Sequence, residues 1–284
     1  TLNNAFEQLA FENVFPLIEK YTFQTCSVAL TLAESEALFV KTRFTLKQPG
    51  AKVPSDEQEK LIATIVSRLD SKIAESDIGK GGGVFAKLSD FSPKDAVGDV
   101  NEKLLRDYAE QLKRLKEDPI TAEANNLSLQ ALIWAKSRQL ISSNGQAIID
   151  LFSRSYRVLD ELERKLTFAT PSVPVSVVLR AWIDLDPAFE FRSFIYHNKL
   201  KGLSQMSTMG LGPPHYPQVE ARRQQLAESA QIFYEQHLAS TLASTCEKSG
   251  GGFVCDLYYH VPDDRWYVVE LNPWETSAAG HLFS

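Results

Sequence analysis

The sequence contains two strand-like runs that together indicate its fold, Phe253-Val-Cys-Asp-Leu-Tyr-Tyr259 and Trp266-Tyr-Val-Val-Glu-Leu-Asn272. Both runs are rich in aromatic and β-branched residues, which favour strands. The segment between them, His260 to Arg265, contains the Pro and Asp residues typical of a turn. The pattern therefore predicts a β-hairpin.

The register of this hairpin brings polar side chains together. A symmetric hairpin centred near Asp263 pairs Asp256 with Glu270 and Val254 with Asn272. Because side chains alternate along a strand, Asp256, Glu270 and Asn272 share one face. Opposed residues have Cβ atoms roughly 5 Å apart, so two carboxylates held in this way repel each other. A hard cation such as Mg²⁺ would compensate, and Mg²⁺ usually accompanies nucleotide phosphates. The alternative is a register slipped by one residue, with both carboxylates solvated on an outer face.

Composition narrows the class of protein. The 284 residues include 44% hydrophobic and 23% charged residues, as in ordinary globular proteins. The net charge of −6 argues against direct binding to nucleic acid or to anionic membranes. No apolar run approaches the roughly 20 residues that span a bilayer, and the chain begins at Thr1 with a polar, amphipathic stretch rather than a signal-peptide pattern. The three cysteines form no CxxC pair and fit reduced thiols, so we expect a cytoplasmic protein.

Periodicity predicts the remaining elements. Apolar residues recur at helical spacing in five segments, 55–73, 99–118, 128–141, 145–166 and 219–243. Ser55 and Gln58 form a capping box at the start of the first of them. Strands are expected at 25–32, at 84–88, and on both sides of a loop within 175–196.

Two further charged positions lie within predicted strands. Lys87, inside Val84–Leu88, must extend to solvent or meet an anion. The glycine run before it lacks Walker A spacing and is typical of a loop. Glu190 and Arg192 are two residues apart and face the same side, where they either pair with each other or contact a ribose hydroxyl and a phosphate. No nucleophile motif such as GxSxG occurs, so no catalytic residue is assigned.

Three groups of segments, in this order along the chain, resemble the cell division cycle protein 123 family. They are Gly82-Gly-Val-Phe-Ala-Lys-Leu-Ser89 with Ser92-Pro-Lys-Asp-Ala96; Leu179-Arg-Ala-Trp182 with Glu190-Phe-Arg192 and Asn198-Lys-Leu-Lys-Gly-Leu-Ser-Gln205; and Phe253-Val-Cys-Asp256 with Glu270-Leu-Asn-Pro273, Glu275 and Leu282-Phe283.

The resemblance implies an α+β, ATP-grasp-like fold in which two lobes with antiparallel sheets enclose a nucleotide. Residues 1–174 would form an N-terminal and central lobe with the Lys87 strand and a helical insertion, and residues 175–284 a C-terminal lobe with the hinge and the metal-binding hairpin. The implied site residues are Lys87 and Arg192 for the phosphates; Arg180, Ala181, Trp182 and Ile183 beside adenine; Asp184 or Glu190 for the ribose; and Asp256, Glu270 and Asn272 for Mg²⁺.

The resemblance also implies a function. Members of the family bind the γ subunit of eukaryotic translation initiation factor 2 (eIF2) and promote assembly of its heterotrimer. We therefore expect a chaperone-like assembly factor that uses ATP and Mg²⁺ in translation initiation, with a link to the cell cycle. Whether it turns ATP over is left open. The alternatives are a divergent ATP-grasp ligase or kinase with another acceptor, and the same fold without nucleotide binding.

The chain also departs from the family pattern. Glu270 stands where the family usually carries Asp, and Met206–Pro217 replaces an Arg- and Tyr-rich segment. The helix-rich region from Asp99 to about Trp134 is longer by roughly one helical hairpin, and the acidic C-terminal tail typical of the family is missing. These departures motivate the alternative of a ligase or kinase with a different partner.

Overall fold

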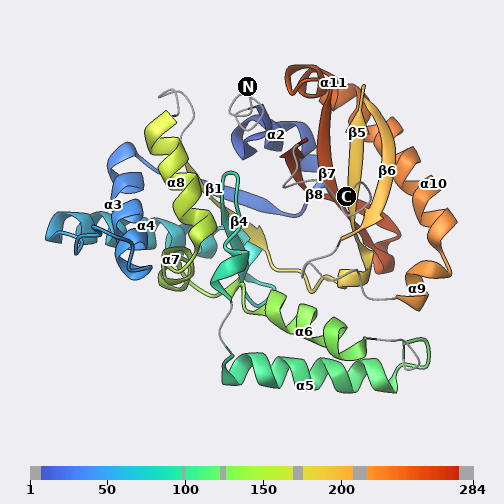
Figure 1. Cartoon of the computed structure of the whole chain (residues 1–284), viewed down its shortest axis with the longest axis horizontal. Helices are drawn as coiled ribbons and strands as arrows, with labels where there is room; N and C mark the ends of the chain where they lie inside the picture. Colours follow the sequence, from blue (N-terminus) through green and yellow to red (C-terminus); the bar gives the residue numbers. More distant parts are fainter. Residues whose placement is uncertain (1–7, 98–99, 122–125, 169–174, 207–215, 275–284) are drawn as a thin grey trace. The chain divides into compact units, whose positions relative to one another are not determined.

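The computed structural model describes residues 8–97, 100–121, 126–168, 175–206 and 216–274. The chain forms two compact units, each with one four-stranded antiparallel sheet (Figure 1). The lysine unit comprises Gln24–Val100 and Gln139–Ile183, and the hairpin unit comprises Thr1–Phe23, Asn101–Arg138 and Asp184–Ser284. The prediction of an α+β fold with antiparallel sheets is confirmed.

The sheet of the lysine unit has the strand order β1-β4-β2-β3. Its strands are β1 (Thr25–Ala29), β4 (Ser176–Ala181), β2 (Val84–Leu88) and the two-residue β3 (Ile141–Ser142). The predicted strands at 25–32 and 84–88 are present, although β1 ends at Ala29 because a helix begins shortly after it.

Helices cover one face of this sheet. They are α3 (Leu32–Thr45), α4 (Asp56–Glu75), α7 (Gly145–Ser153) and α8 (Tyr156–Phe168). Alternate residues of β2 and β4, such as Ala86 and Leu179, pack into one hydrophobic core with helical residues such as Ile65 and Phe152. This burial of apolar surface is the main stabilisation of the unit.

Helix boundaries follow the caps. The predicted capping box of Ser55 and Gln58 is present at the start of α4. The single helix predicted over 145–166 is wrong, because the chain breaks it between α7 and α8. There the Ser155 hydroxyl accepts a hydrogen bond from the Val158 N–H at 3.1 Å and donates one to Asp95 at 2.6 Å. The Ser155 side chain therefore caps the start of α8.

The sheet of the hairpin unit has the strand order β6-β5-β7-β8. Its strands are β5 (Glu190–Tyr196), β6 (Lys199–Gln205), β7 (Gly252–His260) and β8 (Arg265–Pro273). The predicted strand pair at the C-terminal end is confirmed as the hairpin β7–β8, whose turn residue Asp264 has a positive φ of 50°.

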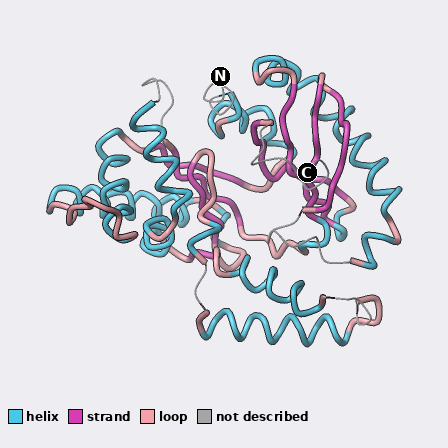
Figure 2. Tube along the Cα trace, viewed as in Figure 1, coloured by secondary structure: helices cyan, strands magenta, loops and turns pink. Residues whose placement is uncertain are grey.

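The helices of this unit are α2 (Phe11–Ile18), α5 (Glu102–Glu117), α6 (Leu127–Arg138), α9 (Pro217–Glu220), α10 (Arg223–Phe233) and α11 (Ala239–Lys248). A π-helical turn, Tyr234–Leu238, joins α10 to α11, so the helix predicted over 219–243 is largely confirmed. Figure 2 shows α5 and α6 as two neighbouring helices, which contact each other along their lengths. None of the described helices combines the length and apolar character needed to cross a membrane.

The predicted lobes are residues 1–174 and 175–284. The two compact units divide the chain at other positions. Strand β4 lies between β1 and β2, so it completes the sheet that contains Lys87. The helical insertion α5–α6 belongs to the hairpin unit. Residues 207–215 of the Met206–Pro217 loop, Glu275 and Leu282-Phe283 lie outside the described residues.

Candidate functional site

The register of the β7–β8 hairpin brings the predicted polar residues together. Asp256 pairs with Glu270, and Val254 pairs with Asn272, as the symmetric hairpin predicts. The slipped register is therefore wrong. A register irregularity lies between Asp256 and Leu257, because Leu257 pairs with Val268 and leaves Val269 as the extra residue of β8.

Arg192 on the adjacent strand β5 neutralises Asp256. The two residues are direct cross-strand neighbours. Arg192 donates from Nε to Asp256 Oδ1 and from Nη2 to Oδ2, each at 2.9 Å. Asp256 is only 1% exposed, so the pair is a buried, bidentate ion pair. Arg192 thus pairs with Asp256 across the strands, and the charge of Glu190 also acts on it.

Asn272 completes this cluster. Its amide Nδ2 lies 3.2 Å from Asp256 Oδ2 and 3.5 Å from Glu270 Oε1. Thus the four residues predicted for Mg²⁺ and for a phosphate lie together on one face of the sheet. We call Arg192, Asp256, Glu270 and Asn272 the carboxylate cluster.

The charges of the neighbouring carboxylates determine the direction in which the pKa of Arg192 is shifted. Burial alone would lower the pKa of Arg192, but the hydrogen bond and charge of Asp256, with the charges of Glu270 and Glu190, raise it above the usual value. Asp256 and Glu270 with Arg192 leave the cluster a formal surplus of one negative charge, and the neighbouring Glu190 adds a second around Arg192. Carboxylate and amide oxygens are donors that a hard divalent cation accepts, so these residues fit Mg²⁺.

Within the described ranges, no group of three or more His, Cys, Asp and Glu side chains is placed to hold a metal ion. The carboxylate cluster differs from such groups because its third candidate ligand is an amide. Its assignment to Mg²⁺ stays a prediction.

Lys87 lies in the lysine unit, on β2, directly opposite Val178 of β4. Its strand neighbours Ala86 and Leu88 enter the hydrophobic core, so Lys87 belongs to the sheet face away from that core. The Lys87 side chain is buried, and its Nζ lies 3.4 Å from the carbonyl oxygen of Asp90. It does not extend to solvent.

The segment predicted to lie beside adenine is the end of β4. Arg180 pairs with Phe85 of β2, so it shares the sheet face of Lys87. Ala181 donates its N–H to the Gln24 carbonyl oxygen at 3.0 Å, and Trp182 donates its N–H to the Gly83 carbonyl oxygen at 3.2 Å. Hydrogen bonds therefore extend one residue past the strand, and Ile183 is the last residue of the unit.

The two residues predicted for the ribose lie in the hairpin unit. Asp184 forms an ion pair with Arg138, at 3.3 Å from Nη1 to Oδ2. Glu190 begins β5, opposite Tyr258, and shares the sheet face of Arg192. The predicted site residues are thus divided between the units, with Lys87 and Arg180–Ile183 in the lysine unit and the others in the hairpin unit.

A buried ionic network behind Lys87 is not predicted by the sequence. The Glu161 carboxylate on α8 accepts the backbone N–H groups of Asp90 at 3.0 Å and of Phe91 at 2.7 Å. Asp90 forms ion pairs with Arg164 and Lys165. Burial, followed by the charge of Asp90, raises the pKa of Glu161 to about 8. The available signal was the four-residue spacing of Glu161 and Lys165 on a predicted helix.

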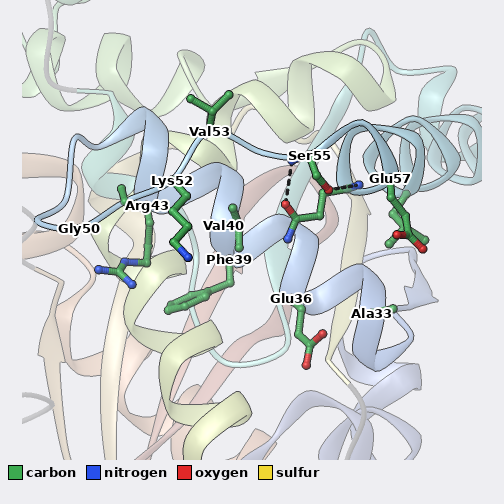
Figure 3. Close-up of a pocket in the computed structure, with 13 residues that line it drawn as sticks. Ala33, Glu36, Phe39, Val40, Arg43, Gly50, Lys52, Val53, Ser55 and Glu57 are labelled. Carbon is green, nitrogen blue, oxygen red and sulfur yellow. Dashed lines mark hydrogen bonds between the residues drawn. The ribbon is translucent and has the colours of Figure 1, made fainter.

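A surface cavity of about 630 Å³ lies elsewhere in the lysine unit, between α3, α4 and the segment that joins them. Figure 3 shows Arg43, Lys52, Glu36 and Phe39 among the residues that line it. The lining carries charges of both signs and includes none of the predicted site residues. It therefore does not bear on the predicted nucleotide site.

Comparison with known proteins decides the family. Residues 138–284 match the D123 family, and this range contains β4, the carboxylate cluster and α7–α11. The chain belongs to the D123 family. The predicted resemblance is thereby confirmed.

Curated relatives and a solved structure agree with this membership. A "Translation initiation factor eIF2 assembly protein" of Lodderomyces elongisporus is 26% identical over 220 residues, which cover 76% of this chain and 49% of the relative. A "Cell division cycle protein 123" of Phaeosphaeria nodorum is 30% identical over 112 residues, covering 39% of this chain and 26% of the relative. The match to the first of these spans about half of its length.

The fold of this chain is similar to that of a protein of known structure. Cdc123 from Schizosaccharomyces pombe is similar to this chain with a TM-score of 0.61 and 19% identity, covering 100% of this chain and 90% of that one. At this identity the likeness establishes the fold alone.

Proposed function

We propose that this protein binds ATP and Mg²⁺ and acts as a cytoplasmic assembly factor for eIF2 by binding its γ subunit. The observation that carries the proposal is the carboxylate cluster. It joins the buried carboxylate of Asp256 to the partly exposed side chains of Glu270 and Asn272, with a surplus of negative charge, within the region that matches the D123 family.

Each predicted residue has a role in this proposal. Asp256, Glu270 and the Asn272 amide would hold Mg²⁺, which supplies charge neutralisation for phosphate oxygens. Arg192 and Lys87 would bind phosphates, because a guanidinium matches phosphate geometry and an ammonium supplies a point charge. Asp184 or Glu190 would contact the ribose.

Arg180–Ile183 would lie beside adenine. Adenine needs hydrogen-bonding groups and a flat apolar contact, which backbone at a strand end and the Trp182 indole offer. Lys87 and Arg180 share a sheet face, which supports a common ligand for β2 and β4.

The partner follows from the relatives. Proteins named eIF2 assembly protein in Lodderomyces elongisporus and Candida albicans are 26% identical to this chain over 220 residues each. We extend that role, and the γ subunit as the contact, to this protein.

The proposal is tested by affinity capture from native cytosol. Tagged wild-type protein and the Asp256→Ala variant are compared with Mg·ATP and with EDTA. We expect the eIF2 γ subunit to be enriched by the wild type with Mg·ATP, and less by the variant. Absence of the γ subunit from wild-type captures, with the protein folded and ATP bound, would contradict the assembly role. Turnover of ATP with another captured acceptor would instead favour a ligase or kinase.

A further inference from the structure

Arg192 occupies both carboxylate oxygens of Asp256. Its Nε and Nη2 atoms each lie 2.9 Å from one oxygen, and Asn272 Nδ2 lies 3.2 Å from Oδ2. Asp256 is 1% exposed, so water competes little for these oxygens. A metal ion that binds Asp256 through both oxygens, or from the side that the guanidinium occupies, must therefore displace at least one of these donors.

We propose that Arg192 acts as a resident counter-cation that keeps Asp256 closed to a divalent metal ion until nucleotide phosphates draw the guanidinium away. This inference rests on the proposed function, because phosphates of a bound nucleotide are the competing partner. A guanidinium binds phosphate with the same two-pronged geometry that it uses for a carboxylate. Transfer of Arg192 from Asp256 to phosphate releases the metal ligand.

Formal charge is not the obstacle to metal binding. The surplus of two negative charges around Arg192 equals the charge of one divalent cation. The obstacle is that hydrogen bonds already use both oxygens of Asp256. A residue that keeps the positive charge but cannot form the two-pronged contact should therefore open the site.

Asn272 belongs to the same closed arrangement. Its NH₂ group faces Asp256 and Glu270, whereas a metal ion requires the amide oxygen. The amide must turn over when the ion enters. In the closed arrangement, nitrogen donors from two side chains, Arg192 and Asn272, thus occupy the carboxylates that an ion would otherwise bind.

The consequence is coupling between the two ligands. Nucleotide binding makes Asp256 available to the metal ion, and by linkage the metal ion raises the affinity for nucleotide. The metal ion alone should bind weakly.

The test measures Mn²⁺ affinity in the absence of nucleotide by the loss of the electron paramagnetic resonance signal of the aqueous ion. Wild type is compared with Arg192→Gln, Arg192→Lys and the control Arg223→Gln. Arg223 is exposed and lies 3.7 Å from Glu220. We expect both Arg192 variants to bind Mn²⁺ roughly tenfold or more tightly than wild type, because neither side chain can hold both Asp256 oxygens through a two-pronged contact. The Arg223 variant should match wild type.

A second titration separates this inference from the proposed function. A fluorescent methylanthraniloyl derivative of ATP is titrated in saturating Mg²⁺, and we expect weaker binding by Arg192→Gln. If wild type binds this probe but the Arg192 variants bind Mn²⁺ no more tightly than wild type, the closed-site inference is overturned alone. If wild type does not bind the probe, both proposals are overturned.

Thermal melting checks that the variants are folded. If Arg192→Gln unfolds, Arg192→Lys decides the test, because it keeps a positive charge beside Asp256. Equal Mn²⁺ affinity of a folded Lys variant and wild type would overturn the inference.

Discussion

Asp256 is buried as a charged group, and Arg192 compensates its charge. The side chains are 1% and 15% exposed. Removal of one partner leaves a charge in a medium that solvates it poorly, which is more costly than removal of both. The pair therefore links local stability to the candidate metal site.

Arg192→Met should lower the free energy of unfolding by about 3–5 kcal/mol, because it leaves Asp256 without its counter-charge. Arg192→Met combined with Asp256→Leu should recover most of this loss. Urea denaturation of both proteins and of Asp256→Leu completes the double-mutant cycle. Additive losses would show that the two charges do not depend on each other.

Glu161 should make stability fall with increasing pH. Its pKa is about 8 in the folded protein and near 4.5 without burial, so the folded state binds the extra proton between these values. Stability from this group is therefore present below pH 4.5 and is lost as pH rises towards 8, by at most about 1.4 kcal/mol per pH unit.

Glu161→Gln should remove this contribution. Denaturant unfolding at several pH values between 4.5 and 8 should give a flatter profile for the variant than for wild type. Glu75→Gln, at an exposed position of α4, provides the control and should keep the wild-type slope. Parallel profiles for wild type and Glu161→Gln would contradict the assignment.

At the scale of elements, α8 holds the segment that follows Lys87. Asp95 in this segment accepts hydrogen bonds from the Ser155 hydroxyl at 2.6 Å and the Tyr156 N–H at 2.7 Å, at the first turn of α8. Glu161 holds Asp90 and Phe91 one turn further along. The segment that follows β2 is thus joined to helix α8 by polar contacts at two levels.

Asp95→Ala should destabilise the protein by about 1–2 kcal/mol, because α8 loses the acceptor at its N-terminus. Asp77→Ala is the control, since Asp77 is 68% exposed and pairs with the exposed Lys80. The control should change stability by less than about 0.5 kcal/mol. Thermal unfolding of both variants measures the difference, and equal effects would contradict the role of Asp95.

Local sequence signals predict some elements and miss others for a physical reason. The capping box of Ser55 and the alternation in β7 and β8 act between near neighbours, so they are readable from the sequence. The break before α8 depends on Asp95, which lies 60 residues from Ser155. The same holds for the pairing of Arg192 with Asp256, which are 64 residues apart. Contacts between residues so far apart in the chain leave no periodic pattern in the sequence from which they could be predicted.

At the scale of the molecule, the chain crosses between the two units four times. The lysine unit is built from Gln24–Val100 and Gln139–Ile183, so the α5–α6 insertion and both terminal regions belong to the hairpin unit. A single boundary at 174/175 would separate β4 from its own sheet, because β4 pairs with β1 and β2, which lie far earlier in the sequence. Family resemblance, rather than periodicity, supplied the predicted fold and the site residues of the lysine unit.

The central claim is that the carboxylate cluster forms part of a Mg·ATP site. Isothermal titration of ATP into the protein tests it most directly, with Mg²⁺ or with EDTA, for wild type, Asp256→Asn and Asp263→Asn. Asp263 is 53% exposed in the turn of the same hairpin and serves as the matched control. We predict that wild type and the control bind ATP with Mg²⁺, and that Asp256→Asn and EDTA each weaken binding roughly tenfold or more. Equal affinity of Asp256→Asn and wild type in Mg²⁺, or no binding by wild type, would contradict the claim.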